Sequence, residues 1–148
     1  MSTGELGLSD QARAIWGKTN RVDDSEWLPL YVHMADSAAM ATRIWSTWVP
    51  QGTKDVISRD FAGDEGLAKK LAVFLAGVHD IGKATPVFQA KPIAFGTEAE
   101  SFVWKAEEAG LPMIAGLRDY NHPTHPIAGE TILEGYLMRV HGWDRKTA

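Results

Sequence analysis

The longest regular pattern of apolar residues lies in the first third of the chain and predicts a long amphipathic helix. Apolar residues recur at alternating steps of four and three, which is the spacing of one helix face; they are Trp27, Tyr31, Met34, Ala38, Ala41, Trp45 and Trp48. We expect the helix to begin at Asp24 or Ser25 and to end at about Trp48, with Pro29 tolerated in the first turn. The small residues around Ala38 would let a second helix approach closely.

A second apolar segment, residues 66–81, predicts a central, buried helix. Its run from Leu71 to Ala76 is apolar almost all round, which is typical of a helix covered on every side. Gly77 lies inside this segment, where glycine costs about 1 kcal/mol relative to alanine. A close crossing by another helix would explain that residue. We expect Gly82 and Pro86 to end the helix.

The remaining segments predict shorter helices and turns. Ser9 or Asp10 is expected to cap a short helix, and residues 98–109 and 126–140 are expected to form two more. Residues 50–66 contain several glycines and charges and indicate a loop or a short helix. No segment shows the alternation of a convincing strand, so the pattern predicts an all-α fold. The length of 148 residues suits one domain.

Composition narrows the class of protein. The chain is 45% hydrophobic and 23% charged, as in ordinary globular proteins. A net charge of -4 excludes a generic basic nucleic-acid-binding protein, so much of any affinity for DNA or RNA would come from a metal, a partner or another domain. The absence of cysteine excludes disulfides and cysteine-ligated metals. The N-terminus has no apolar signal core, and we expect a cytoplasmic protein without a membrane span.

The sequence His79-Asp80-Ile81-Gly82-Lys83 carries the main candidate chemistry. An imidazole beside a carboxylate offers two metal ligands, and the negative end of a helix dipole favours a bound cation. This pair of ligands suits Mn, Fe, Co, Ni or Zn better than Ca. Lys83 could contact a phosphate as a point charge. For His79 and Asp80, the alternative to metal binding is a histidine at a helix end with Asp80 in a cap-like turn. For Lys83, the alternative to phosphate binding is an exposed lysine at a helix end.

Four other histidines are weaker candidates when each is taken alone. His33 lies in the middle of the long predicted helix, and Asp36, three residues on, could orient its ring. Packing of two helices could bring His33 to His79. His125 is a better ligand candidate than His122, because it precedes the start of a helix and can point back into a bundle. His122 and His141 are interpreted as surface residues.

Several motifs occur together in a characteristic order. They are Trp16-Gly17-Lys18, Trp27-Leu28-Pro29-Leu30, His33-x-x-Asp36, His79-Asp80-Ile81-Gly82-Lys83-Ala84-Thr85-Pro86-x-Phe88-Gln89 and His125-Pro126-Ile127-Ala128-Gly129. From about residue 9 to residue 138, the chain resembles the HD nuclease domain of the type I CRISPR-associated nuclease-helicase, within the HD superfamily of metal-dependent phosphohydrolases. The segment from His79 to Gln89 is the most specific part of the match.

The resemblance implies a helical bundle with a metal site between helices and an enzyme that degrades single-stranded DNA. It implies that His33, His79, Asp80 and His125 match metal-ligand positions, for a divalent ion such as Mn, Fe, Co, Ni, Mg or Zn. Lys83 matches the lysine that follows the His-Asp pair, and the catalytic residues would be His79, Asp80 and Lys83. The implied partners are single-stranded DNA, a helicase and the CRISPR surveillance complex.

One departure from the family pattern leaves other functions open. The family continues with a paired His-His-Gly and a further Asp, and neither occurs in residues 1–148. We therefore expect a single HD-type domain that is the N-terminal part of a longer domain or protein, or a short variant. One alternative is an HD phosphohydrolase acting on small nucleotides. Another is a catalytically silent helical module that binds a helicase or the surveillance complex.

Overall fold

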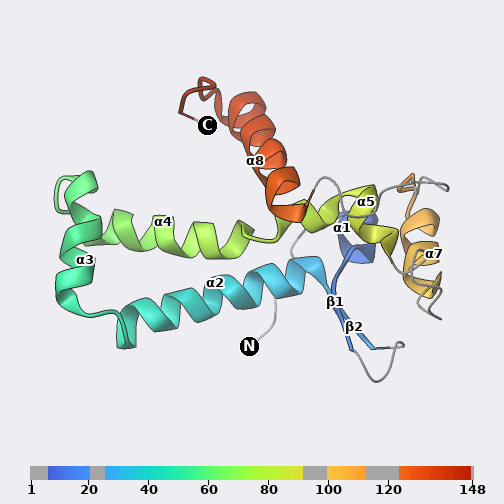
Figure 1. Ribbon diagram of the computed structural model, residues 1–148, viewed down its shortest axis with the longest axis horizontal. Helices are drawn as coiled ribbons and strands as arrows, with labels where there is room; N and C mark the ends of the chain where they lie inside the picture. Colours follow the sequence, from blue (N-terminus) through green and yellow to red (C-terminus); the bar gives the residue numbers. More distant parts are fainter. Residues whose placement is uncertain (1–6, 21–25, 92–99, 113–123, 148) are drawn as a thin grey trace. The chain divides into compact units, whose positions relative to one another are not determined.

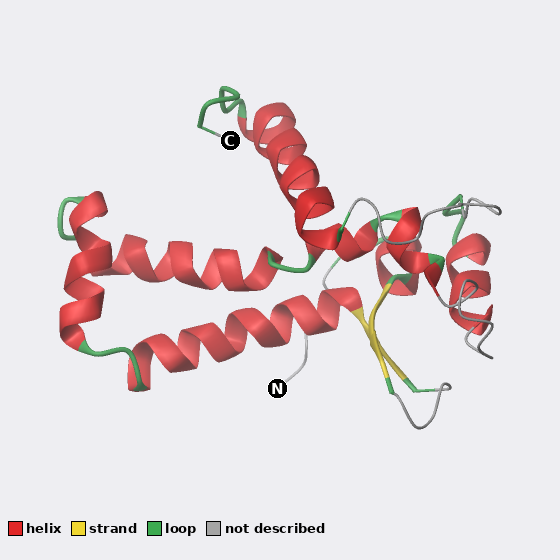
Figure 2. Cartoon of the chain, in the orientation of Figure 1, coloured by secondary structure: helices red, strands yellow, loops and turns green. Residues whose placement is uncertain are grey.

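The computed structural model describes residues 7–20, 26–91, 100–112 and 124–147, which are mainly helical (Figures 1 and 2). The predicted all-α class is confirmed, with one small two-stranded sheet in addition. The chain divides into two compact units: Met1–His33 with Asp80–Ala148, and Met34–His79. Among the described residues, no helix is both long and apolar enough to cross a membrane.

The first unit begins with a short capped helix. Helix α1 spans Asp10–Ala14, and the Ser9 Oγ accepts a hydrogen bond from the backbone N–H of Ala12 at 3.3 Å. The N-terminal helix predicted from a Ser9 or Asp10 cap is therefore confirmed.

A small sheet follows α1 and was missed by the sequence analysis. Strand β1, Trp16–Thr19, pairs antiparallel with β2, Trp27–Pro29, so that Trp16 lies opposite Pro29. Helix α2 then spans Leu30–Thr47. The expected helix start at Asp24 or Ser25, residues that lie outside the described ones, is thus wrong, because Trp27–Pro29 is a strand. The residue before a proline favours extended backbone, which explains why the helix begins only after Pro29.

The second unit consists of the rest of α2, helix α3 at Gln51–Ser58, a 3-10 turn η1 at Arg59–Phe61, and helix α4 at Glu65–Val78. Helices α2 and α4 run side by side, joined through α3 (Figure 1). A Cβ atom added at Gly77 would lie 3.4 Å from the Cβ of Ala38. The close helix approach predicted at Gly77 and near Ala38 is therefore found between these two helices.

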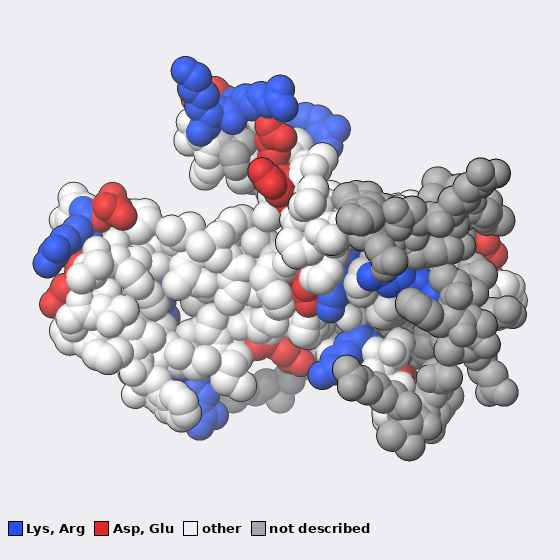
Figure 3. Space-filling model, in the orientation of Figure 1, with Lys and Arg blue, Asp and Glu red and all other residues white. Residues whose placement is uncertain are grey.

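Helix α4 is less buried than predicted. Ala68 and Gly77 are buried, whereas its large apolar residues Leu67, Leu71, Phe74 and Leu75 are exposed. Much of the face of α2 and α4 seen in Figure 3 carries neither acidic nor basic side chains. The prediction of a central, buried helix is wrong, because α4 buries the small residues Ala68 and Gly77 and leaves its larger apolar residues at the surface.

Among its described residues, the first unit also contains η2 at Ile81–Ala84, α5 at Pro86–Gln89, α7 at Glu100–Glu108 and the longer helix α8 at His125–His141. The two predicted C-terminal helices are thus confirmed. Gly110 and Gly142 follow α7 and α8 with positive φ angles of 79° and 69°, which glycine adopts without strain. The predicted end of the preceding helix at Gly82 is wrong, because α4 ends at Val78 and Gly82 lies within η2.

Candidate metal centre

The carboxylate of Asp80 is the centre of a polar cluster in the first unit. Asp80 is only 6% exposed. Its Oδ2 lies 2.8 Å from the Nε2 of His33 and 2.8 Å from the Nζ of Lys83, and its Oδ1 lies 3.3 Å from the Nε2 of His125. A buried carboxylate is costly unless charged or polar groups contact it, so these three side chains stabilise Asp80 in its position.

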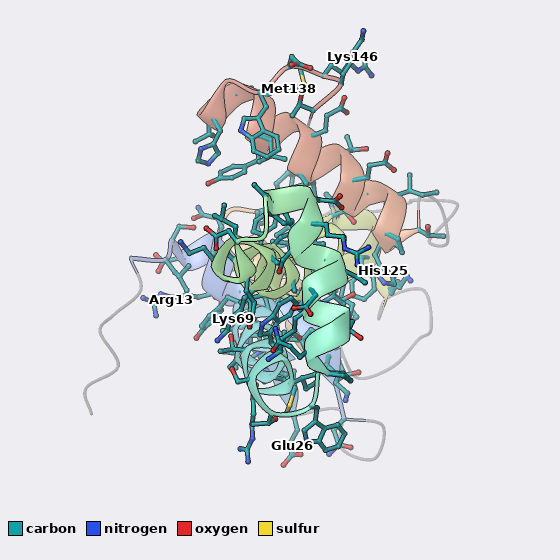
Figure 4. The ribbon with its side chains drawn as sticks, turned by 90° about the vertical axis from the view of Figure 1, so that its left-hand side faces the viewer. Arg13, Glu26, Lys69, His125, Met138 and Lys146 are labelled. Atoms are coloured by element: carbon teal, nitrogen blue, oxygen red, sulfur yellow. The ribbon has the colours of Figure 1, made fainter. Side chains whose placement is uncertain are left out.

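Three separate elements bring these side chains together. His33 lies in the first turn of α2, Asp80 and Lys83 lie at η2, and His125 is the first residue of α8. Figure 4 labels His125 at this end of α8 and Met138 near the other. The cluster therefore depends on the packing of η2 against the start of α8.

A pair of glycines makes that packing possible. A Cβ atom added at Gly82 would collide with the backbone oxygen of His125 and crowd the backbone nitrogen of Gly129. A Cβ atom at Gly129 would in turn lie 3.3 Å from the Gly82 nitrogen. Gly82 is thus required for close approach of two backbones, and its position after His79-Asp80 sets the distance between Asp80 and His125.

His79 is held in a tautomer suited to metal binding. It directly follows α4, it is exposed, and its Nδ1 lies 2.8 Å from the backbone oxygen of Ala76. Because a carbonyl oxygen can only accept, the Nδ1 atom donates the proton, and in the neutral ring the Nε2 atom carries the lone pair. Metal-binding histidines commonly make this kind of hydrogen bond through their second nitrogen.

The donor set fits a divalent transition metal. One potential ligand atom from each of His33, His79 and Asp80 lies within 4.8 Å of the others. Imidazole and carboxylate ligands together suit Mn, Fe, Co, Ni or Zn. His125, the fourth residue expected from the sequence, contacts the same carboxylate through Oδ1. The four residues named as metal ligands, His33, His79, Asp80 and His125, therefore all lie at or directly beside Asp80.

Lys83 is held at two points. Its Nζ donates to the backbone oxygen of Gly17 at 2.9 Å as well as contacting Asp80, and it lies 5.5 Å from the ring centroid of Phe88. Its side chain is 15% exposed. The alternative of an exposed helix-end lysine is therefore wrong, and the ammonium belongs to the polar cluster.

Gln89 is the residue whose role the sequence analysis missed. The sequence analysis treated it only as part of a motif, yet it is 1% exposed and its side chain forms three hydrogen bonds. The sequence offers one signal for this buried role: Gln89 is a polar residue directly after the apolar residue Phe88, within a motif that also contains charged residues. The ring centroid of Phe88 lies 4.7 Å from that of Trp16, with the two rings tilted, and 5.7 Å from that of His125 in an edge-to-face contact.

The other candidate residues have different outcomes. His141 is exposed, as interpreted from the sequence, and its Nε2 lies 3.2 Å from the hydroxyl of Tyr136 in the last turns of α8. His122 lies outside the described residues. The role suggested for Asp36 in orienting His33 stays a prediction.

The fold and the site define a helical protein of the HD class, with histidines gathered around a buried aspartate. Comparison with known families agrees with this class. The family model described as "Cas3, HD domain" matches residues 16–148, and the chain belongs to this family.

Two curated relatives carry the same family name. The chain is 37% identical over 117 residues to the CRISPR-associated nuclease/helicase Cas3 of Streptococcus thermophilus, across 74% of this chain and 13% of the relative. It is 35% identical over 85 residues to the CRISPR-associated endonuclease/helicase Cas3 of Thermus thermophilus, across 57% of this chain and 9% of the relative. The chain thus spans only a small part of the length of these relatives. No solved structure matches it.

Proposed function

We propose that this chain is the metal-dependent nuclease domain of a Cas3-type system and that it hydrolyses phosphodiester bonds of single-stranded DNA in type I CRISPR interference. The observation that carries the proposal is the buried Asp80 carboxylate contacted by His33 and His125, with His79 as its neighbour in the chain. The helicase and the surveillance complex are the proposed partners. The relatives named nuclease/helicase support this assignment.

The proposed ligands of a divalent ion are His33, His79, Asp80 and His125. When bound, a divalent cation lowers the pKa of a coordinated water and offsets negative charge on the phosphoryl oxygens. The chain contributes the orientation of the donors. The carbonyl of Ala76 fixes the His79 tautomer, and the buried surroundings of Asp80 keep its carboxylate between two imidazoles.

Lys83 is the proposed contact for the scissile phosphate. An ammonium has three N–H donors, and Asp80 and the Gly17 carbonyl accept two of them. The third donor and the positive charge would attract a phosphate oxygen next to the metal ligands. In this position Lys83 would hold the substrate without having to leave Asp80.

Cleavage assays with single-stranded DNA test the proposal directly. The purified 148-residue chain is incubated with a labelled oligonucleotide and with Mn, Co, Ni, Mg, Fe or Zn in turn. We expect cleavage with at least one metal and loss of cleavage in His79→Ala. The matched control is His141→Ala, which removes an exposed histidine at the far end of α8 and should leave cleavage unchanged.

Two results would contradict the proposed function. One is a folded protein that cleaves nothing with any metal, and the other is full activity in His79→Ala. Hydrolysis of small nucleotides without cleavage of DNA would instead indicate a phosphohydrolase of the HD superfamily. The same samples can report this result if nucleotides are included as a second substrate.

A further inference from the structure

The side-chain amide of Gln89 joins two segments that are distant in sequence. Its Oε1 accepts from the backbone N–H of Trp16 at 3.1 Å, and its Nε2 donates to the backbone oxygens of Trp16 and Lys83, both at 2.8 Å. Both donor hydrogens of the amide are therefore used, in a location that is almost fully buried. Gln89 ties strand β1 to the turn η2 that carries Lys83.

The same two segments meet again at the Lys83 ammonium. Its Nζ donates to the carbonyl oxygen of Gly17, the residue after Trp16, at 2.9 Å. It also contacts the Asp80 Oδ2 at 2.8 Å. The hydrogen bonds of Gln89 thus hold Trp16 and the Lys83 backbone at a fixed separation. That separation places the Gly17 carbonyl within reach of the Lys83 side chain.

We propose that Gln89 is a positioning residue: it holds the Gly17 carbonyl where it receives the Lys83 ammonium, and so keeps that ammonium on Asp80. A lysine side chain has many rotamers, and without a fixed acceptor its ammonium would spend time in water. The consequence for DNA cleavage rests on the function proposed above. The effect on the position of Lys83 does not, and it is measurable without metal or substrate.

The first experiment measures the chemical accessibility of Lys83 in the metal-free protein. Reductive methylation is followed by mass spectrometry, with the exposed Lys70 and Lys146 as internal references. In Gln89→Met, which keeps the length of the side chain and removes the amide, we expect Lys83 to react several-fold faster relative to these references. A Lys83 side chain held between Gly17 and Asp80 is poorly accessible to the reagent and reacts slowly, whereas a released one reacts like the surface lysines.

Trp16→Phe is the matched control. It removes the indole Nε1 that donates to the backbone oxygen of Gln89 at 3.2 Å, so it also deletes a buried hydrogen bond between the same two residues. It keeps all three bonds of the Gln89 amide. We expect the reactivity of Lys83 to stay as in the wild-type protein. Gln89→Asn replaces Gln89→Met if the latter does not fold, because the shorter amide cannot span the same three partners.

The second experiment measures single-stranded DNA cleavage in a double-mutant cycle. If Gln89 acts through Lys83, Gln89→Met and Lys83→Met each lower kcat, and Gln89→Met has no further effect in the Lys83→Met background. A purely structural role would lower activity equally in both backgrounds. Equal Lys83 reactivity in folded Gln89→Met or Gln89→Asn and in the wild-type protein would overturn the proposal. If the wild-type chain cleaves no DNA, the nuclease proposal fails, and the methylation rates still decide the role of Gln89.

Discussion

The surroundings of Asp80 in the first unit and the helix pair of the second unit are stabilised in different ways. Around Asp80, polar groups far apart in sequence contact one another: the side chain of His33 is 47 residues from that of Asp80, and the backbone N–H of Trp16 is 73 residues from the Gln89 amide that accepts its hydrogen bond. In the second unit, α2 and α4 meet through small residues such as Ala38 and Gly77. The helix pair depends on small residues where the two helices come close, whereas the site depends on a few individual polar partners.

Two carboxylates show the same difference. Asp80 is buried and contacts two imidazoles and one ammonium. Glu65 of the second unit has a side chain that is 45% exposed and lies near Gln51, Trp45 and Lys54. The hydrogen bonds from Gln51 and Trp45 lower the pKa of Glu65, and Lys54 adds to this effect. Glu65 makes surface contacts of small energetic value, whereas removal of a partner from Asp80 would leave a buried charge.

The largest expected effect on stability is that of Gly82→Ala. The new methyl group meets backbone atoms of His125 and Gly129, which cannot move aside as a flexible side chain could. We expect the free energy of unfolding to fall by about 3 kcal/mol or more, at the upper end for overpacking. Urea unfolding followed by circular dichroism measures the change.

The control for this variant is Gly52→Ala in the second unit. A Cβ atom at Gly52 has no neighbour within 4 Å, so the variant should gain up to about 1 kcal/mol from better helix propensity. Equal stability of Gly82→Ala and the wild-type protein would show that η2 and α8 do not meet at this glycine.

Two neighbouring tryptophans at the C-terminal end of the predicted apolar stripe are expected to show the next largest difference in stability when each is replaced. Trp45 is buried and its Nε1 donates to the Glu65 Oε1 at 3.4 Å, whereas Trp48 is 81% exposed. Trp45→Ala should lower the free energy of unfolding by about 3 kcal/mol. Trp48→Ala should change it by less than about 0.5 kcal/mol. Losses of similar size would mean that Trp48 is covered as Trp45 is.

A smaller difference in stability is expected between two variants of α4. Ala68 is fully buried, whereas Leu75 is 54% exposed. Ala68→Leu should cost about 2 kcal/mol through overpacking, and Leu75→Gln should change stability by less than about 0.5 kcal/mol. Thermal unfolding of the two variants measures the difference. A large loss in Leu75→Gln would restore the interpretation of α4 as a buried helix.

The smallest expected effect is a change in the pH dependence of stability at acidic pH in Glu65→Gln. The pKa of Glu65 is lowered from 4.5 in the folded chain, so its contribution to stability is complete above that value. The contribution is lost as the pH falls through the lower folded-state pKa. Melting temperatures measured across this range should depend less on pH in Glu65→Gln than in the wild-type protein. Glu107→Gln, on the exposed part of α7, controls for the change in net charge, and the same slope in both variants would contradict this role of Glu65.

Helices with clear boundary residues could be predicted from the sequence, and the contacts between elements only in part. Gly110 and Gly142 end α7 and α8 near the predicted positions because they adopt positive φ angles, a local property of glycine. A close helix approach at Gly77 and one near Ala38 were each predicted, because small residues allow them, but the pairing of these two residues was not. The short strand Trp27–Pro29 was not predicted, because neither it nor its partner Trp16–Thr19 is long enough to show alternation.

For the site, the residue types could be predicted, and their partners could not. The motif around His79 and Asp80 named the candidate ligands, because imidazole and carboxylate have a characteristic chemistry. The contacts of Gln89 with Trp16 and of Lys83 with Gly17 depend on backbone atoms, which carry no signal in the sequence. Gly82 was misread as a helix end for the same reason, because the backbone of α8 that it contacts is distant in the chain.

We propose that Asp80 organises the metal centre, and metal titration of Asp80→Asn is a direct test of this role. Isothermal calorimetry with Mn²⁺ compares the wild-type protein, Asp80→Asn and Asp60→Asn, which loses the same charge at an exposed position of η1. We expect the wild-type protein and Asp60→Asn to bind Mn²⁺ equally, and Asp80→Asn to bind it at least about 100-fold more weakly. A loss of this size exceeds the one expected when a residue that only hydrogen-bonds to a metal ligand is replaced. Equal affinity in Asp80→Asn and the wild-type protein would contradict the claim.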